Sequence, residues 1–135
     1  ILSLLYTMTV LIVGIMDLEY KVANLQEDAK ILKNFKQVSF IVTAYESSEQ
    51  SCGPWAKYLQ TKTGTTPSAL RTIAVDPAVI PLGSLVYIEG IGWRLAEDTG
   101  RLITGHHIDI FCSTKDKAKE FGIQNRKVYY QPVQT

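Results

Sequence analysis

Six short β-rich runs constrain the fold of this chain more than any other feature of its sequence. They cover residues 38–45, 72–75, 85–88, 93–96, 108–111 and 128–130. In the first run, Val38, Phe40 and Val42 alternate with other side chains, which is the period of a strand with one buried face. Turn residues such as Asp76 and Pro77 separate the runs. We therefore predict a mainly β fold, a small six-stranded barrel, because closing the sheet removes its exposed edges.

A helix is expected between the last two strands. Residues 114–121 have helical composition, Ser113 is a candidate N-cap, and Gly122 follows the last helical residue. The barrel should therefore carry one or two short helices.

The first 16 residues contain no charge and predict a hydrophobic helix. At about 1.5 Å per residue this segment covers ~24 Å, somewhat less than the ~30 Å hydrocarbon core of a bilayer. Because the chain begins with Ile1 rather than Met, we expect the true N-terminus to lie upstream and to supply the missing span. A membrane anchor is favoured over a cleaved signal peptide, since residues 17–22 lack a small-residue cleavage pattern. A buried core helix is a third interpretation.

An amphipathic stalk should follow this segment. Apolar residues at 18, 22, 25, 29 and 32 repeat with 4-3-4-3 spacing and lie on one stripe of a helix. The two heptads present are fewer than a coiled coil requires. We therefore expect three parts: an anchor or signal-like segment (1–16), a helical stalk or linker (17–37) and a barrel domain (38–135).

Composition narrows the possible functions. Fourteen Lys and Arg against 13 Asp and Glu give a net charge of +1, so a nucleic-acid-binding protein is not expected. Cys52 and Cys112 allow one disulfide, although two unpaired thiols are the simpler interpretation. His106 and His107 are adjacent, and on a strand they would point to opposite faces, so no metal site and no cofactor is expected.

Three aspartates stand out from the other carboxylates by their context. Asp76 ends an apolar strand, Asp98 precedes a glycine turn, and Asp109 lies between apolar residues of a strand. Burial raises the pKa of a carboxyl group, as a general acid near neutral pH requires. Structural roles, such as capping a turn before proline, are the alternative. The Asp-Thr-Gly triplet at 98–100 also occurs in aspartic proteases, but there it follows two apolar residues and is followed by Ala, unlike the residues here.

Taken in order, five motifs resemble one known family. They are Ile73-Ala-Val-Asp-Pro77, Val79-Ile-Pro-Leu-Gly83, Val86-Tyr-Ile-Glu-Gly90, Ala96-Glu-Asp-Thr-Gly100 and His107-Ile-Asp-Ile-Phe111. This set closely resembles the 3D domain, which is named for three aspartates. That domain occurs in bacterial cell-wall proteins of the stationary-phase survival and resuscitation-factor-like group, and in the membrane-bound lytic transglycosylase A family. The likeness covers about residues 38–133.

The resemblance implies a double-psi β-barrel that acts on peptidoglycan. It implies that Asp109 is the catalytic acid and base, that Asp98 lies beside it in a groove, and that Asp76 belongs to the same cluster. The substrate-binding residues it implies are Tyr45, Thr63, Gly64, Thr99 and Gly100.

The chain departs from the family at several positions. Arg101 replaces the second glycine of Asp-Thr-Gly-Gly, Thr104 replaces a lysine, and His106-His107 replace Asn-Arg. Of the cysteine cluster that several relatives have near the first loop, Cys52 remains. These changes alter the groove wall, so they bear on substrate affinity and activity more than on the fold.

The resemblance therefore implies a lytic transglycosylase that cleaves the MurNAc–GlcNAc bond and leaves a 1,6-anhydro end. Ordinary glycosidases need two carboxyl groups, whereas this reaction uses one as acid and then as base. Like-charge repulsion from Asp98 and Asp76 would keep a proton on Asp109. A glycan-binding module without turnover and a hydrolase using water remain alternatives. The expected partners are peptidoglycan glycan strands and, through residues 1–16, a bacterial membrane with the barrel outside the cytoplasm. The oligomeric state stays open.

Overall fold

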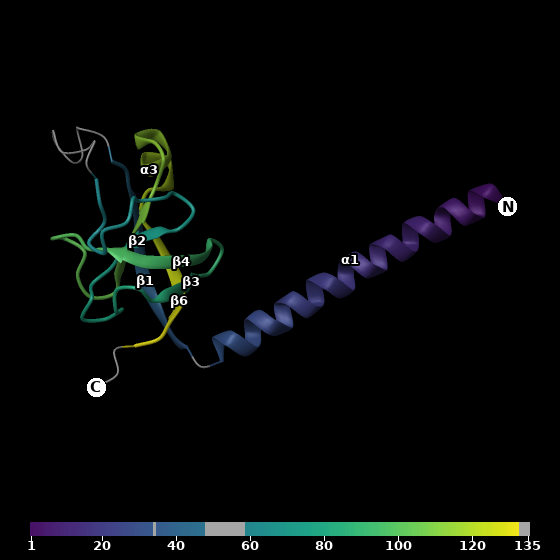
Figure 1. Cartoon of the computed structure of the whole chain (residues 1–135), viewed down its shortest axis with the longest axis horizontal. Helices are drawn as coiled ribbons and strands as arrows, with labels where there is room; N and C mark the ends of the chain where they lie inside the picture. The colour runs from purple at the N-terminus through teal and green to yellow at the C-terminus, as the bar shows by residue number, and fades with distance from the viewer. Residues whose placement is uncertain (34, 48–58, 133–135) are drawn as a thin grey trace. The chain divides into compact units, whose positions relative to one another are not determined.

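The computed structural model describes residues 1–33, 35–47 and 59–132 of the chain. The chain divides into two units, residues 1–34 and 35–135. The first unit is helical and the second is a β-barrel (Figure 1).

Six strands in the described residues close into one barrel (Figure 1). They are β1 (Lys36–Tyr45), β2 (Thr72–Ala74), β3 (Leu85–Ile88), β4 (Gly92–Asp98), β5 (His107–Phe111) and β6 (Gln124–Tyr130). The order around the barrel is β1-β5-β2-β4-β3-β6. The pairs β1–β5 and β2–β4 are parallel, and the other four pairs are antiparallel. The prediction of a mainly β, six-stranded barrel is confirmed.

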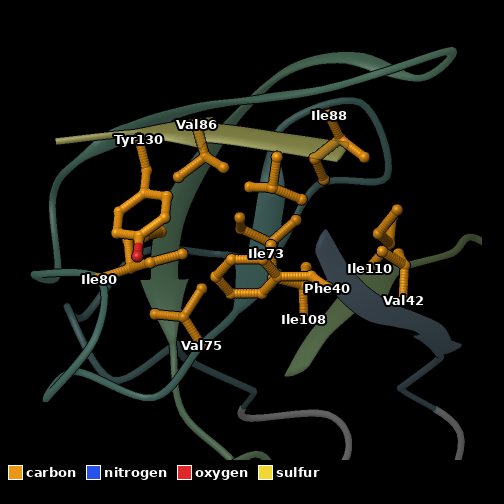
Figure 2. Close-up of a cluster of buried hydrophobic side chains, with 12 residues drawn as sticks. Phe40, Val42, Ile73, Val75, Ile80, Val86, Ile88, Ile108, Ile110 and Tyr130 are labelled. Carbon is orange, nitrogen blue, oxygen red and sulfur yellow. The ribbon is translucent and has the colours of Figure 1, made fainter. Parts of the chain in front are cut away.

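The barrel interior is filled by apolar side chains that alternate along the strands (Figure 2). Every strand contributes, and the largest fully buried side chains include Tyr130, Phe40, Ile73, Ile80, Ile88 and Ile108. The rings of Phe40 and Tyr130 meet edge to face, with centroids 5.5 Å apart. Because these residues use one face of each strand, the residues between them point out of the barrel. This outer face presents the polar side chains discussed below.

Four strands run beyond their predicted limits, and in β1 and β6 the cause is their pairing with each other. The helical pattern predicted a helix to residue 37, but β1 begins at Lys36, which pairs with Tyr130 of β6. Likewise, β6 begins at Gln124 rather than at Val128, because its first residues pair with β1. The antiparallel ladder of β1 and β6 therefore overrides the local pattern at both positions.

The predicted short helix is present as α3 (Lys115–Phe121). Its N-cap is Thr114 rather than the predicted Ser113, because the Thr114 side chain accepts the backbone N–H of Lys117 at 3.3 Å. Gly122 ends the helix as predicted, with a positive φ of 63° that glycine adopts without strain.

The N-terminal segments form one continuous helix, α1 (Leu2–Leu32). No break separates the uncharged residues from the charged ones that begin at Asp17, where an exposed ion pair to Lys21 spans 2.6 Å. At 1.5 Å per residue α1 is about 46 Å long. In length and composition α1 could cross a membrane.

Candidate active site

Four residues on neighbouring strands form a row on the outer face of the barrel. Thr43 of β1 pairs with Asp109 of β5, Asp109 pairs with Ala74 of β2, and Ala74 pairs with Asp98 of β4. Paired residues share a face of the sheet. Since neighbouring strands lie about 4.8 Å apart, the Cα atoms of Asp109 and Asp98 are separated by about 10 Å. The sheet therefore brings these two predicted aspartates onto one surface, with the short side chain of Ala74 between them.

A β-bulge places Asp98 in this row. The register between β2 and β4 shifts after Ile73, which pairs with Ala96, so that the next residue, Ala74, pairs with Asp98. Glu97 is the extra residue of β4. Ala96 points into the core, and without the bulge Asp98 would point there too. The bulge thus turns the Asp98 side chain to the outer face, as bulges beside active sites often do.

Asp109 is half-buried, between the buried residues Ile108 and Ile110 of β5. Its Oδ1 accepts the hydroxyl of Thr43 at 2.8 Å. Burial raises the pKa of Asp109, while the hydrogen bond from Thr43 and the charge of His107 oppose the rise. The sequence predicted a raised pKa from burial and from like-charge repulsion, and burial is the cause that acts. A carboxyl with a raised pKa can hold a proton to donate.

His107 lies next to Thr43 and Asp109, a position that the sequence did not predict for it. His107 Nε2 lies 2.9 Å from the Thr43 hydroxyl. Because the hydroxyl hydrogen goes to Asp109, Thr43 accepts from His107, which requires a proton on Nε2. His106 points elsewhere, and its ring lies 4.8 Å from that of Phe40. The two histidines therefore diverge, and the described residues contain no cluster of three potential metal ligands.

Asp98 accepts three hydrogen bonds. Its Oδ2 accepts the hydroxyl of Tyr45 at 3.0 Å. Its Oδ1 accepts the backbone N–H groups of Lys62 at 3.0 Å and Thr99 at 2.9 Å. Tyr45 is in turn held edge to face against Phe111, with ring centroids 5.3 Å apart. Asp98 is thus fixed by donors from three separate segments.

Asp76 holds two turns together. It lies two residues after Ala74, and its Oδ1 accepts the N–H of Ala78 at 2.9 Å. Its Oδ2 accepts the N–H of Gly105 at 2.7 Å, which fastens the loop before β5 to the end of β2. These bonds, that from Gly105 first, lower the pKa of Asp76. Asp76 is therefore ionised and bonded to backbone, in contrast to Asp109.

Four of the predicted substrate-binding residues, Thr63, Gly64, Thr99 and Gly100, lie in two loops beside Asp98, and the fifth, Tyr45, is the last residue of β1. Thr63 and Gly64 lie in a turn where Thr63 N–H donates to the carbonyl of Glu97 at 3.0 Å. Gly100 is needed for packing, because a Cβ there would lie 2.7 Å from Cγ1 of Ile103. Cys52 lies outside the described residues, and with it the choice between one disulfide to Cys112 and two unpaired thiols.

Part of the barrel matches a family model. Residues 71–132 match the 3D domain, and this part of the chain is a 3D domain. Tyr45, Thr63 and Gly64 precede the matched range, whereas all three aspartates lie within it.

Relatives come from Bacillus subtilis. The chain is 44% identical over 87 residues to the protein named "Putative cell wall shaping protein YabE", covering 64% of this chain and 21% of YabE. It is 50% identical over 58 residues to cell wall-binding protein YocH, covering 43% of this chain and 20% of YocH. The SPbeta prophage-derived uncharacterized protein YorM is 36% identical over 111 residues, covering 80% of this chain and 46% of YorM. The chain therefore spans less than half the length of these relatives.

Solved structures with a partial likeness include Escherichia coli lytic transglycosylase MltA in its D308A variant. That likeness has a TM-score of 0.47 and 16% identity, covering 56% of this chain and 28% of MltA. The lytic transglycosylase LtgG of Burkholderia pseudomallei gives a TM-score of 0.43 and 28% identity, covering 55% and 27%. Both scores lie below 0.5, so the family assignment rests on the sequence match.

Proposed function

We propose that this protein is a peptidoglycan lytic transglycosylase that cleaves the MurNAc–GlcNAc β-1,4 bond and leaves a 1,6-anhydro-MurNAc end. The observation that carries the proposal is the half-buried Asp109, whose pKa is raised, in one row with Asp98 on the outer face of a 3D domain. The names of YabE and YocH, which refer to cell wall shaping and cell wall binding, support a cell-wall substrate.

Asp109 serves in turn as acid and base. Its proton passes to the glycosidic oxygen as the bond between that oxygen and MurNAc C1 breaks. The C6 hydroxyl of the same MurNAc then bonds to C1, and its proton returns to Asp109. The product is an anhydro sugar, and no water is consumed. Burial favours the protonated form of Asp109 at the start of this cycle, and the hydroxyl of Thr43 orients the carboxyl.

Asp98 and Asp76 have supporting roles in this proposal. Asp98 is fixed by Tyr45, Lys62 and Thr99, so it can accept hydrogen bonds from sugar hydroxyls at a set position. Asp76 shapes the loop before β5 through Gly105. Thr63, Gly64 and Gly100 form the neighbouring turns that would contact the glycan.

Two other functions compete with this one. A glycan-binding module without turnover is favoured by the name of YocH and by Arg101 and Thr104, which depart from the family motif. A hydrolase is the other alternative, because Asp98 is a second carboxyl group on the same surface as Asp109, and ordinary glycosidases use two.

We further propose that the barrel lies outside the cytoplasm, held to the membrane through α1. The uncharged first half of α1 has the composition for such an anchor, and peptidoglycan is extracytoplasmic.

Mass spectrometry of purified peptidoglycan incubated with the full chain tests the function. Soluble fragments with 1,6-anhydro-MurNAc ends are expected. Reducing MurNAc ends would show that the protein is a hydrolase instead. Bound protein with no released fragments would show that it is a binding module.

A further inference from the structure

We propose that Glu97 is a positioning residue, which sets the loop of residues 61–66 against Asp98. Glu97 is the extra residue of the β4 bulge and is 2% exposed, although it is charged. A buried carboxylate is costly unless it is fully hydrogen-bonded, so its partners show what it organises. The proposal that this matters for catalysis rests on the function proposed above.

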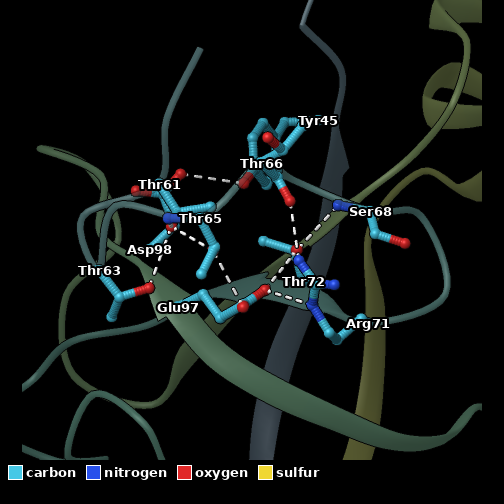
Figure 3. A network of polar contacts seen from close by, with 10 residues as sticks. All are labelled: Tyr45, Thr61, Thr63, Thr65, Thr66, Ser68, Arg71, Thr72, Glu97 and Asp98. Atoms are coloured by element: carbon cyan, nitrogen blue, oxygen red, sulfur yellow. Dashed lines mark hydrogen bonds and ion pairs between the residues drawn. The ribbon is translucent and has the colours of Figure 1, made fainter.

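The Glu97 carboxylate accepts hydrogen bonds from three side chains (Figure 3). Two of them precede β2, and the third belongs to the first residue of β2. Its Oε1 accepts the hydroxyl of Thr65 at 2.9 Å. Its Oε2 accepts Arg71 Nε at 2.9 Å and the hydroxyl of Thr72 at 2.6 Å. The backbone carbonyl of Glu97 accepts the N–H of Thr63 at 3.0 Å. One residue therefore holds the loop at two points.

The loop itself is closed by internal hydrogen bonds. The N–H of Thr61 donates to the carbonyl of Thr65 at 2.8 Å, and the N–H of Thr65 donates to the Thr61 hydroxyl at 3.1 Å. Arg71 Nη2 donates to the carbonyl of Thr66 at 2.7 Å. Because the loop is a closed unit, a change at Thr65 is passed to Lys62, whose N–H donates to Asp98 Oδ1.

The charge of Glu97 fits a structural anchor rather than a proton donor. Burial alone would raise the pKa of Glu97, but the hydrogen bonds from Thr72, Arg71 and Thr65 and the charge of Arg71 lower it below its ordinary value. Glu97 therefore remains a carboxylate and acts on the site through the loop.

Amide hydrogen exchange of the full chain, measured by NMR well below the melting temperature, tests the coupling. Glu97→Gln keeps the shape but removes the charge and one acceptor. We expect the Lys62 amide to exchange at least about 10-fold faster, while the paired amides of β5 keep their rates. The exposed Glu89→Gln is the matched control and should change neither. An unchanged Lys62 rate, or an equal acceleration in β5, would overturn the proposal.

A milder pair of variants covers the case in which Glu97→Gln fails to fold. Thr65→Val removes only the hydroxyl that reaches Glu97 and Thr61, whereas Thr65→Ser keeps it. Thr65→Val should accelerate Lys62 exchange and lower kcat by about 10-fold or more, since small misplacements in a site are costly, and Thr65→Ser should restore both. Equal behaviour of the two variants would contradict the proposal. An inactive wild-type chain would overturn the proposed function, and the exchange rates would still decide the role of Glu97.

Discussion

Replacing Asp109 by asparagine should separate catalysis from folding. The Asp109→Asn variant keeps the size of the side chain and an oxygen that can accept the Thr43 hydroxyl, which donates to the native carboxylate at 2.8 Å. It lacks the carboxyl group that the proposed reaction uses first to donate a proton and then to accept one. The change therefore removes the chemistry and leaves the local geometry in place.

The expected loss of turnover is large. General acid–base catalysis contributes about 10²–10⁴-fold, and here one group serves in both steps. We therefore expect kcat to fall at least about 10²-fold, which corresponds to ~2.7 kcal/mol of transition-state stabilisation. Glycan binding should be largely kept. Asp98→Asn should reduce turnover less, and Asp76→Asn least, because Asp76 is bonded to backbone N–H groups.

The thermal stability of Asp109→Asn, in contrast to its turnover, should not fall. Burial raises the pKa of Asp109 above its ordinary value of 3.8, so the folded state binds this proton more tightly than the unfolded state. The resulting stabilisation is present below pH 3.8 and is lost as the pH rises through the folded-state pKa. Above that folded-state pKa, the half-buried carboxylate of Asp109 disfavours folding. Asp109→Asn should melt at the same or a higher temperature at about pH 7.

The assay combines anhydro-muropeptide release with thermal unfolding of the full-length wild type and variant. A folded Asp109→Asn chain that cleaves peptidoglycan at nearly the wild-type rate would refute the reasoning and make Asp98 the acid. A variant with a clearly lower melting temperature at neutral pH would show that Asp109 is needed for folding.

Thr43→Val should raise the pKa of Asp109 further, because the hydroxyl group that lowers this pKa is lost. The alkaline limb of the pH profile of kcat/KM should therefore move to higher pH. A limb that does not move would argue against Asp109 as the acid. Asp76→Asn should lower the melting temperature at neutral pH, because the hydrogen bonds that lower the pKa of Asp76 stabilise the fold while its carboxyl group is ionised. The difference from the wild type should shrink as the pH falls toward 3.8 and below. A difference independent of pH would contradict this. Activity should survive EDTA, because the proposed reaction uses carboxyl groups alone; abolition by EDTA with recovery on added zinc would require a metal site. In cell fractionation the full-length protein should stay in the membrane pellet at high salt, and release by salt alone would mean that α1 is not an anchor.

The barrel could be predicted because each strand is recognisable from its local sequence. Alternation placed Phe40 and Val42 on the buried face, and turn residues bounded the short strands, as β3 at residues 85–88 illustrates. The helix cap was less certain, since Ser113 and Thr114 are both good caps and the backbone selects Thr114.

The arrangement of the site depends on pairings that no local pattern contains. Ala96, Glu97 and Asp98 read as simple alternation, and the bulge that turns Asp98 outward exists only in the register with β2. Thr43 reaches Asp109 because β1 and β5 pair across 66 positions of sequence. Of the two causes expected for the raised pKa of Asp109, the apolar neighbours correctly indicated burial. Repulsion from Asp98 does not contribute, because the fold sets the two carboxylates two strands apart.

Cleavage of peptidoglycan in H₂¹⁸O by the full chain tests the central claim most directly. If Asp109 accepts the proton of the MurNAc C6 hydroxyl as that oxygen closes on C1, water takes no part in the step. The new 1,6-anhydro ends should then contain no ¹⁸O, while a muramidase run in parallel should introduce one label at each reducing end it forms. New reducing ends carrying ¹⁸O in the presence of this protein would contradict the account and show that water is the nucleophile.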